Sequence, residues 1–198
     1  MLNLVLENDN LIARAYAFAS LKHKEQKYGK KPYIIHLLDV FSVARRFVDW
    51  DQLYPEFINA CILHDVVEDT DCSYDELMSL FGYKTAELVW AVTNEPGQNR
   101  KERAIKTYPK IINTEHALRL KLCDRIANLE NTVSHDRRGR RPQKIFLMYE
   151  RERFDFESAL RSKCFSESEI EKNMWIHLEK LFIEGREKIQ FYETNKLV

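Results

Sequence analysis

The spacing of apolar residues constrains the fold of this chain more than any other feature. Apolar side chains recur mostly every three or four positions, which is the spacing that one face of an α-helix requires. Glycine and proline, the residues that most often interrupt helices, occur only five times each. We therefore predict an all-α fold without internal repeats or low-complexity segments.

Length and composition favour one domain, and we expect residues 1–198 to form a single helical bundle. A chain of 198 residues with 44% hydrophobic content can bury one core but is short for two. Lysine plus arginine and aspartate plus glutamate both number 31, so the net charge of zero offers no general attraction to nucleic acid or membranes. We expect neither as a partner, and the sequence leaves the oligomeric state open.

Cysteine usage and the N-terminal residues indicate the compartment. The four cysteines, at positions 61, 72, 123 and 164, show no CxxC spacing, which suits a reducing cytoplasm. The first ten residues are too acidic and contain too few apolar residues for a signal peptide. No run approaches the roughly 18 apolar residues of a membrane span. We therefore expect a soluble cytoplasmic protein.

The stretch from Cys61 to Asp71 carries the strongest chemical signal. In a continuous helix four of its polar residues would share one arc of about 140°, with apolar residues opposite: His64, Asp65, Glu68 and Asp69. Adjacent residues do not face each other on a helix, but a metal ion above the gap could bind both His64 and Asp65. Taken alone, the pair is more often part of a solvated amphipathic helix.

Three segments resemble the hydrolase domain of RelA/SpoT-type enzymes, which belong to the HD superfamily of metal-dependent phosphohydrolases. Residues 63–70, Leu-His-Asp-Val-Val-Glu-Asp-Thr, resemble the family's His-Asp and Glu-Asp motifs. Residues 117–129 contain Leu-Lys-Leu-Cys-Asp-Arg-Ile-Ala-Asn-Leu and resemble the signature whose Asp completes the metal site. Residues 26–36 resemble the family's basic segment, which ends in a metal-binding His. The resemblance covers about residues 8–131, and two further helices are expected at about 142–162 and 167–191.

The resemblance implies an HD-type bundle with one divalent metal ion between helices. The implied ligands are one His and one Asp from separate segments and the central pair: His36, Asp124, His64 and Asp65. Mn²⁺ is the family's usual metal, although imidazole and carboxylate ligands also suit Zn²⁺, Fe²⁺ or Co²⁺. Glu68 and Asp69 would then orient or deprotonate the attacking water.

Two basic segments are candidates for substrate phosphate binding. They are the lysines before His36 and the first turns of a helix after the Pro-Gly loop at 93–103: Lys27, Lys30, Lys31, Arg100, Lys101 and Arg103. Basic residues oppose the dipole at a helix start, so an anionic ligand is one explanation for the second group. Asn128 lies four residues after Asp124, on the same helix face, and is a further candidate. The linker with Arg137, Arg138, Arg140 and Arg141 is expected to be solvated, with a mobile lid as the alternative.

By this resemblance the chain would be a stand-alone small alarmone hydrolase. It would release pyrophosphate from the 3′ position of (p)ppGpp and leave GDP or GTP. Another HD phosphohydrolase remains open, namely a nucleotide or NADPH phosphatase or a hydrolase of adenine alarmones. A nucleotide-binding regulator that has lost turnover is the alternative outside enzymes.

Overall fold

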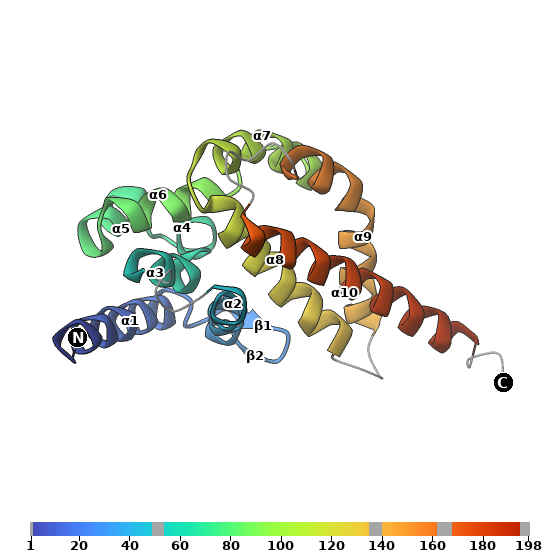
Figure 1. Cartoon of the computed structure of the whole chain (residues 1–198), viewed down its shortest axis with the longest axis horizontal. Coiled ribbons are helices and arrows are strands. Elements are labelled where there is room, and N and C mark those ends of the chain that lie inside the picture. Colours follow the sequence, from blue (N-terminus) through green and yellow to red (C-terminus); the bar gives the residue numbers. More distant parts are fainter. Residues whose placement is uncertain (1, 49–53, 135–139, 162–167, 195–198) are drawn as a thin grey trace.

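The computed structural model describes residues 2–48, 54–134, 140–161 and 168–194 (Figure 1). Helices dominate this part of the chain, and its strands form one short hairpin. The elements, in chain order, are α1 Leu2–Lys22, β1 Lys27–Tyr28, β2 Lys31–Pro32, α2 Ile34–Phe47, α3 Pro55–Leu63, α4 Val66–Asp69, α5 Tyr74–Phe81, α6 Tyr83–Val92, α7 Arg100–Asn113, α8 Ala117–Ser134, α9 Arg140–Leu160 and α10 Glu169–Thr194. The all-α prediction is confirmed.

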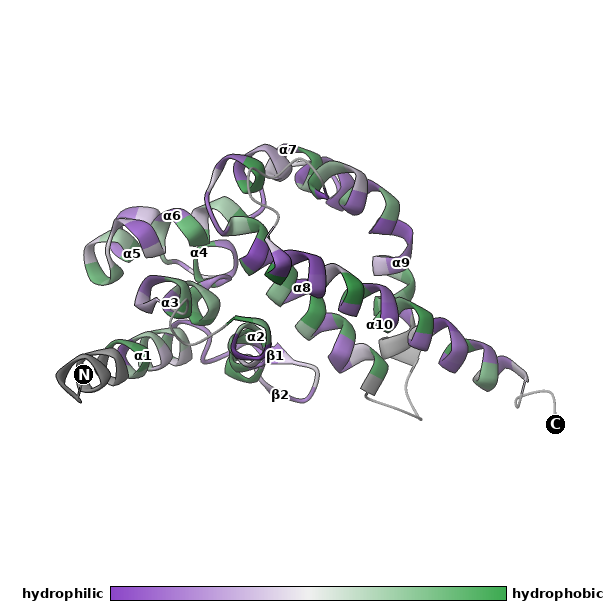
Figure 2. Cartoon of the chain, in the orientation of Figure 1, coloured by the Kyte–Doolittle hydropathy of each residue, from purple (hydrophilic) through white to green (hydrophobic). Residues whose placement is uncertain are grey.

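Helices α3 and α8 form the centre of the bundle. Helix α8 contacts α2, α3, α6, α7, α9 and α10, whereas α3 packs against α1, α2 and α6 as well. Every residue of α3 from Phe57 to Leu63 is buried, and the apolar residues of α8 are buried on several sides. The outer helices alternate between hydrophobic and hydrophilic residues along their length (Figure 2), as expected for helices with one solvated face. Of the candidate metal ligands, Asp124 therefore lies on one of these central helices, and His64 and Asp65 directly follow the other.

The helix predicted to run through the central motif is interrupted at that motif. Helix α3 ends at Leu63 and α4 begins at Val66, so the prediction of one continuous helix is wrong. The backbone of Asp65, at φ −102° and ψ −2°, lies in a sparsely populated region that does not continue a regular helix. Adjacent side chains on a regular helix diverge by about 100°. The interruption instead brings His64 and Asp65 side by side.

Three other segments differ from what their local sequence favours. Helix α1 begins at Leu2, although Asn8–Asn10 offer N-cap residues further along the chain. Helix α7 continues past Pro109, although proline usually ends a helix, since Thr107 and Ile111 are buried around it and packing outweighs the proline's cost of about 3 kcal/mol. The lysine segment forms the β1–β2 hairpin, whose turn uses the positive φ of Gly29 (66°).

Other predictions at this level are confirmed within the described residues. Ser73 caps α5 by accepting a hydrogen bond from the Glu76 amide at 3.1 Å, and α9 and α10 lie near the two predicted C-terminal ranges. No described helix is both long and apolar enough to cross a membrane. Cys61, Cys72 and Cys123 are buried free thiols, while Cys164 and most of the predicted basic linker lie outside the described residues.

A buried ion pair links α10 to α8, and its loss should be costly. Arg119 Nε donates to Glu171 Oε1 at 2.7 Å, and the two side chains are 7% and 4% exposed. We expect Glu171→Ala to lower the free energy of unfolding by about 3 kcal/mol, because it leaves the Arg119 charge buried and unpaired. Urea unfolding of the whole chain measures this. The control Glu169→Ala, on the exposed side of the same helix turn, should change it by less than about 0.5 kcal/mol, and equal effects would contradict the prediction.

Candidate metal site and phosphate pocket

Four side chains from separate elements converge at one point between helices. His36 comes from α2, His64 and Asp65 from the interruption between α3 and α4, and Asp124 from α8. His64 Nε2 lies 2.9 Å from Asp65 Oδ2 and 3.8 Å from Asp124 Oδ1. His36 Nε2 lies 3.6 Å and 3.4 Å from the same two oxygens. The structure thus brings together all four predicted ligands, and the ligand atoms of His36, His64 and Asp65 lie within 4.8 Å of one another.

The tautomer of His64 favours a cation at this point. Its Nδ1 lies 3.1 Å from the Cys61 carbonyl oxygen, which can only accept, so the neutral ring carries its hydrogen on Nδ1. The lone pair of Nε2 then faces the two carboxylates, and this buried atom has no hydrogen-bond partner among the described residues. Lone pairs that face one another repel unless a proton or a metal ion lies between them. The residues therefore fit a divalent ion bound by imidazole and carboxylate.

The charges at the site shift the pKa values of its groups. Burial alone would lower the pKa of His64, but Asp65 and Asp124 outweigh it and raise the pKa to about 9. Burial likewise raises the pKa of the Asp65 carboxyl, yet His64 beside it holds that pKa well below its usual range. The carboxylates thus stay ionised and attract a positive charge, which a proton on His64 supplies at neutral pH when no metal ion is bound. A cluster with this combination of burial and perturbed pKa values is typical of a functional site.

Neighbouring side chains orient the candidate ligands. Tyr33 donates to Asp65 Oδ2 at 2.5 Å, and Lys121 Nζ lies 3.2 Å from Asp124 Oδ2. The ring of Tyr28 stacks on His36 with the centroids 4.8 Å apart. Such outer contacts fix the orientation of ligands and commonly support metal affinity. Sequence reasoning gave Tyr28, Tyr33 and Lys121 no role, although all three lie within the segments that carry the family resemblance.

Asn128, predicted to bind substrate, lies against a metal-ligand candidate. Its Nδ2 donates to Asp124 Oδ1 at 2.6 Å, and its Oδ1 accepts from the Tyr28 hydroxyl at 2.9 Å. Both hydrogen-bonding groups of the amide are therefore engaged within the protein. In this structure Asn128 orients Asp124, and its contact with substrate stays a prediction.

Glu68 and Asp69 lie on α4, directly after the metal-binding pair. Glu68 accepts hydrogen bonds from the backbone and side-chain nitrogens of Asn94, both at 2.9 Å. Asp69 accepts from Gln26 Nε2 at 2.8 Å. Burial raises the pKa of Asp69; Gln26 opposes this shift and the charge of Asp65 adds to it. Both carboxylates are exposed and held in fixed orientations, as a group that handles the proton of a water must be.

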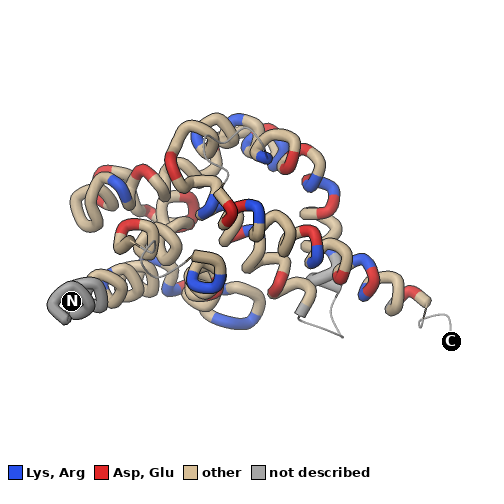
Figure 3. The backbone as a smooth tube through the Cα atoms, viewed as in Figure 1, with Lys and Arg blue, Asp and Glu red and all other residues tan. Residues whose placement is uncertain are grey.

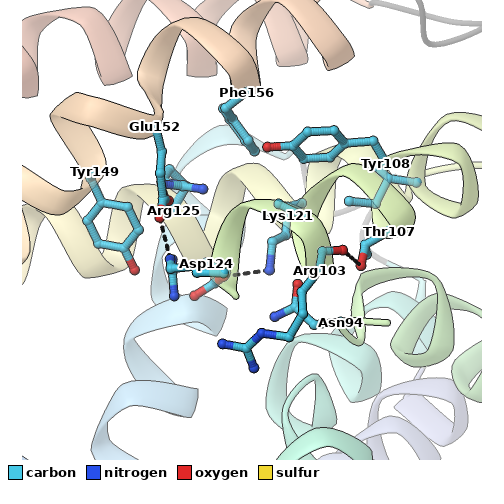
Figure 4. Close-up of a pocket in the computed structure, with 13 residues that line it drawn as sticks. Asn94, Arg103, Thr107, Tyr108, Lys121, Asp124, Arg125, Tyr149, Glu152 and Phe156 are labelled. Carbon is cyan, nitrogen blue, oxygen red and sulfur yellow. Dashed lines mark hydrogen bonds and ion pairs between the residues drawn. The ribbon is translucent and has the colours of Figure 1, made fainter. Parts of the chain in front are cut away.

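A basic pocket adjoins the metal cluster through Asp124, which lines both (Figure 4). Helices α7, α8 and α9 supply most of its walls. Its cationic side chains are Arg100, Arg103, Lys121 and Arg125. Tyr149, Glu152 and Phe156 of α9 also line it, and sequence reasoning missed them because α9 lies outside the segments that resemble the family. The pocket combines cationic donors with aromatic walls.

The predicted phosphate-binding residues divide into three groups. Arg100 and Arg103 line the pocket, whereas Lys101 is not among the lining residues and pairs with Asp155 at 2.7 Å. Lys27, Lys30 and Lys31 are exposed on the hairpin, which Figure 3 shows with basic residues below α2, and none of the three lines the pocket. The carboxylates of α9 pair with Arg100 and Lys101, so the protein itself supplies anions to the basic start of α7.

Comparison with known proteins identifies the family. Residues 13–150 match the HD domain family. The chain belongs to this family. A solved structure of a metazoan ortholog of SpoT, described as hydrolysing ppGpp, has a TM-score of 0.65 to this chain at 22% identity. The similarity covers 88% of this chain and 94% of that one, and it shows that the HD fold was correctly predicted.

Curated relatives carry a pyrophosphohydrolase activity in their names. A guanosine-3′,5′-bis(diphosphate) 3′-pyrophosphohydrolase of Aquifex aeolicus (strain VF5) is 39% identical over 125 residues, which are 60% of this chain. The MESH1 proteins of Danio rerio and Xenopus tropicalis, which carry the same activity in their names, are 33% and 32% identical over 58% and 61% of this chain. This chain spans 17% of the Aquifex protein, 64% of the Danio protein and 69% of the Xenopus protein.

Metal content tests the site without any assay of turnover. We expect purified protein incubated with Mn²⁺ and then desalted to retain about one ion per chain, since the four ligand candidates form one cluster. His64→Ala should lose most of that metal, because it removes the ligand whose lone pair faces both carboxylates. Elemental analysis of both proteins measures this. His177→Ala, which removes a partly buried imidazole bound to Glu130, should retain the ion, and metal-free protein throughout would refute the site.

Proposed function

We propose that this protein hydrolyses (p)ppGpp, releasing pyrophosphate from the 3′ position and leaving GDP or GTP. One observation carries the proposal: a four-residue cluster suited to a divalent ion opens into a pocket with four cationic side chains. A site of this kind suits phosphoryl chemistry on a polyanionic small molecule. The names of the relatives, which state this reaction, support the choice of substrate.

The proposed cofactor is a single Mn²⁺ ion. His36, His64, Asp65 and Asp124 would hold it. When bound, such an ion polarises a phosphoryl group and lowers the pKa of a coordinated water. The contacts of Tyr33 with Asp65 and of Asn128 with Asp124 would keep the ligand oxygens aimed at the ion's position.

Glu68 and Asp69 are the proposed proton-handling residues. Asn94 holds both oxygens of the Glu68 carboxylate, so this group is preset to accept a proton from the attacking water. Gln26 donates a hydrogen bond to Asp69, the residue next to Glu68, and so fixes the orientation of its carboxylate. The raised pKa of Asp69 suits a group that shares or returns a proton. Attack at the phosphorus next to the ribose 3′ oxygen would release pyrophosphate.

The two basic regions suit a substrate with phosphates at two positions of one ribose. The pocket offers the Arg100 and Arg103 side chains from α7 beside Lys121 and Arg125 from α8. The hairpin offers Lys27, Lys30 and Lys31 on a separate element. A nucleoside monophosphate carries its charge at one end and would use one region. We therefore assign one end of the alarmone to each region.

Residues 1–198 act, in this proposal, as one catalytic domain in the cytoplasm. The α9 residues that line the pocket, together with the packing of α9 and α10 against the central α8, support a single unit. The buried free thiols of Cys61, Cys72 and Cys123 are compatible with a reducing compartment. The proposed partner is a small nucleotide.

Replacing one carboxylate should separate catalysis from metal binding. Glu68→Gln keeps the hydrogen-bonding shape but removes the base, so kcat should fall by on the order of 10² or more. Mn²⁺ affinity should stay within a few-fold, because Glu68 is placed outside the ligand set. Steady-state kinetics and calorimetric Mn²⁺ titration measure the two effects. Glu76→Gln, which alters a carboxylate paired with Lys22, is the control, and joint loss of metal and activity would make Glu68 a ligand.

A substrate panel tests the alarmone assignment. We expect kcat/KM for ppGpp at least about tenfold above those for GMP, dGMP or NADPH, a gap of about 1.4 kcal/mol in transition-state stabilisation. Product analysis by anion-exchange chromatography should show GDP and pyrophosphate. Release of inorganic phosphate, or a preference for NADPH, an adenine alarmone or a monophosphate, would refute this substrate but leave an HD hydrolase. Metal-loaded protein without turnover of any of these would indicate a nucleotide-binding regulator.

The hairpin lysines provide a separate test of the two-region arrangement. Replacing Lys27, Lys30 and Lys31 together by Ala should raise KM for ppGpp at low salt, because it removes charge that attracts one end of the substrate. The effect should shrink as salt is added, since exposed charges are screened over about 10 Å at 0.1 M ionic strength. Lys84→Ala, an exposed lysine on α6, is the control. An unchanged KM would exclude the hairpin from substrate binding.

A further inference from the structure

One carboxylate occupies the basic pocket without taking part in the metal cluster. Glu152 of α9 accepts from Arg100 Nε through Oε1, and its Oε2 lies 3.3 Å from Arg125 Nη1. The pocket's other acidic residue among those described, Asp124, faces the metal cluster and Lys121. Figure 4 shows Glu152 of α9 beside Arg125 of α8. A single carboxylate thus engages two of the four cationic side chains.

Arg125 is held in place without Glu152. Its guanidinium carbon lies 4.3 Å from the ring centroid of Tyr149 and 4.4 Å from that of Phe156, and its side chain is 8% exposed. Stacking on two aromatic rings fixes the plane of a guanidinium and leaves its N–H groups to bond in that plane. Glu152 is therefore not needed to orient Arg125. It occupies a donor that is already in position.

A phosphate group would compete for the donors that Glu152 uses. Carboxylates and phosphates bind guanidinium groups through the same charge-assisted hydrogen bonds. An anion that approaches Arg100 and Arg125 also meets the negative charge of Glu152 between them. The Glu152 side chain is 24% exposed, so solvent is available to it if an anion takes its place. The pocket can therefore have two states, one in which Glu152 bonds Arg100 and Arg125 and one in which an anion has displaced its carboxylate.

We propose that Glu152 is an internal competitor for phosphate groups in this pocket and so sets its affinity for polyphosphates. The inference deepens the proposed function, on which it rests only for the nature of the ligand. A pocket in which Arg100 and Arg125 had no carboxylate beside them would retain released pyrophosphate. The carboxylate of Glu152 returns to Arg100 and Arg125 as the anion leaves, which favours product release. It is a specificity-determining residue that disfavours binding unless an anion makes enough contacts to displace it.

The test measures binding of inorganic pyrophosphate to the Mn²⁺-loaded full chain by isothermal titration calorimetry. Glu152→Gln keeps the size of the side chain and removes its charge. We expect the dissociation constant to fall at least about fivefold at low salt, because Arg100 and Arg125 lose their counter-ion and gain from an added anion. The gain should diminish at high salt. Glu152→Asp, which keeps the charge but shortens the side chain, should give a smaller gain.

Asp155→Asn is the matched control. Asp155 lies on the same helix and pairs with Lys101 of α7 at 2.7 Å, but neither residue is among those that line the pocket. The variant removes the same charge from the same pair of helices, and its pyrophosphate affinity should equal that of the parent. Weaker binding in Glu152→Gln would make Glu152 a scaffold for the arginines and overturn the inference. Unchanged binding, an equal gain in Asp155→Asn, or no pyrophosphate binding in any protein would overturn it too.

The binding test stands apart from the substrate assignment. It requires no turnover, and pyrophosphate contains no base or ribose. If Glu152→Gln binds pyrophosphate more tightly but the parent protein does not hydrolyse ppGpp, the role of Glu152 as a competitor stands and the proposed function fails. If the parent protein hydrolyses ppGpp but Glu152→Gln leaves the pyrophosphate affinity unchanged, the proposed function stands and the role of Glu152 fails.

Discussion

Repulsion between lone pairs at one buried point is the constraint on which this structure depends. His36 and His64 are each 2% exposed, and both aim Nε2 at the carboxylates of Asp65 and Asp124. Burial of such a set is costly unless a positive charge lies at its centre. The set nevertheless lies at the centre of the bundle, on α2, on α8 and at the junction that follows α3. The centre of the bundle thus holds four hydrogen-bond acceptors close together. This arrangement is favourable if a cation offsets their repulsion.

The same constraint accounts for the local departures from regular helix. A continuous helix through residues 61–71 would aim His64 and Asp65 about 100° apart. The interruption at this pair lets both reach the point that His36 approaches from α2, and it leaves Glu68 and Asp69 on the short α4 beside it. The hairpin that precedes α2 serves the site as well, because it places the ring of Tyr28 on His36.

The sequence predicted the helical class and the four convergent ligands, but for different reasons. Helix periodicity is local and can be read at each segment, as for α5 with its Ser73 cap. The convergence of His36, His64, Asp65 and Asp124 came from motif resemblance, since no spacing relates residues so far apart. The hairpin and the interruption were missed because tertiary contacts, not local preference, decide them. Tyr149, Glu152 and Phe156 were missed for the same reason: their packing around Arg125 could have suggested a core position as readily as a pocket wall.

The candidate metal ligands and the α9 wall of the pocket lie on different elements, which suggests how selectivity for anions can change while the metal site is kept. The metal-ligand candidates lie on α2, α8 and the α3–α4 junction, which the family match includes, whereas Glu152 and Phe156 lie just beyond its end at residue 150. A substitution on α9 alters which anions the pocket favours but touches no ligand. Because Arg125 follows Asp124 directly on α8, however, its guanidinium links the α9 wall to the metal cluster. In our proposal, phosphate selection and the metal cluster therefore meet at two adjacent residues of one buried helix, so α9 can vary only where Arg125 keeps its place between Tyr149 and Phe156.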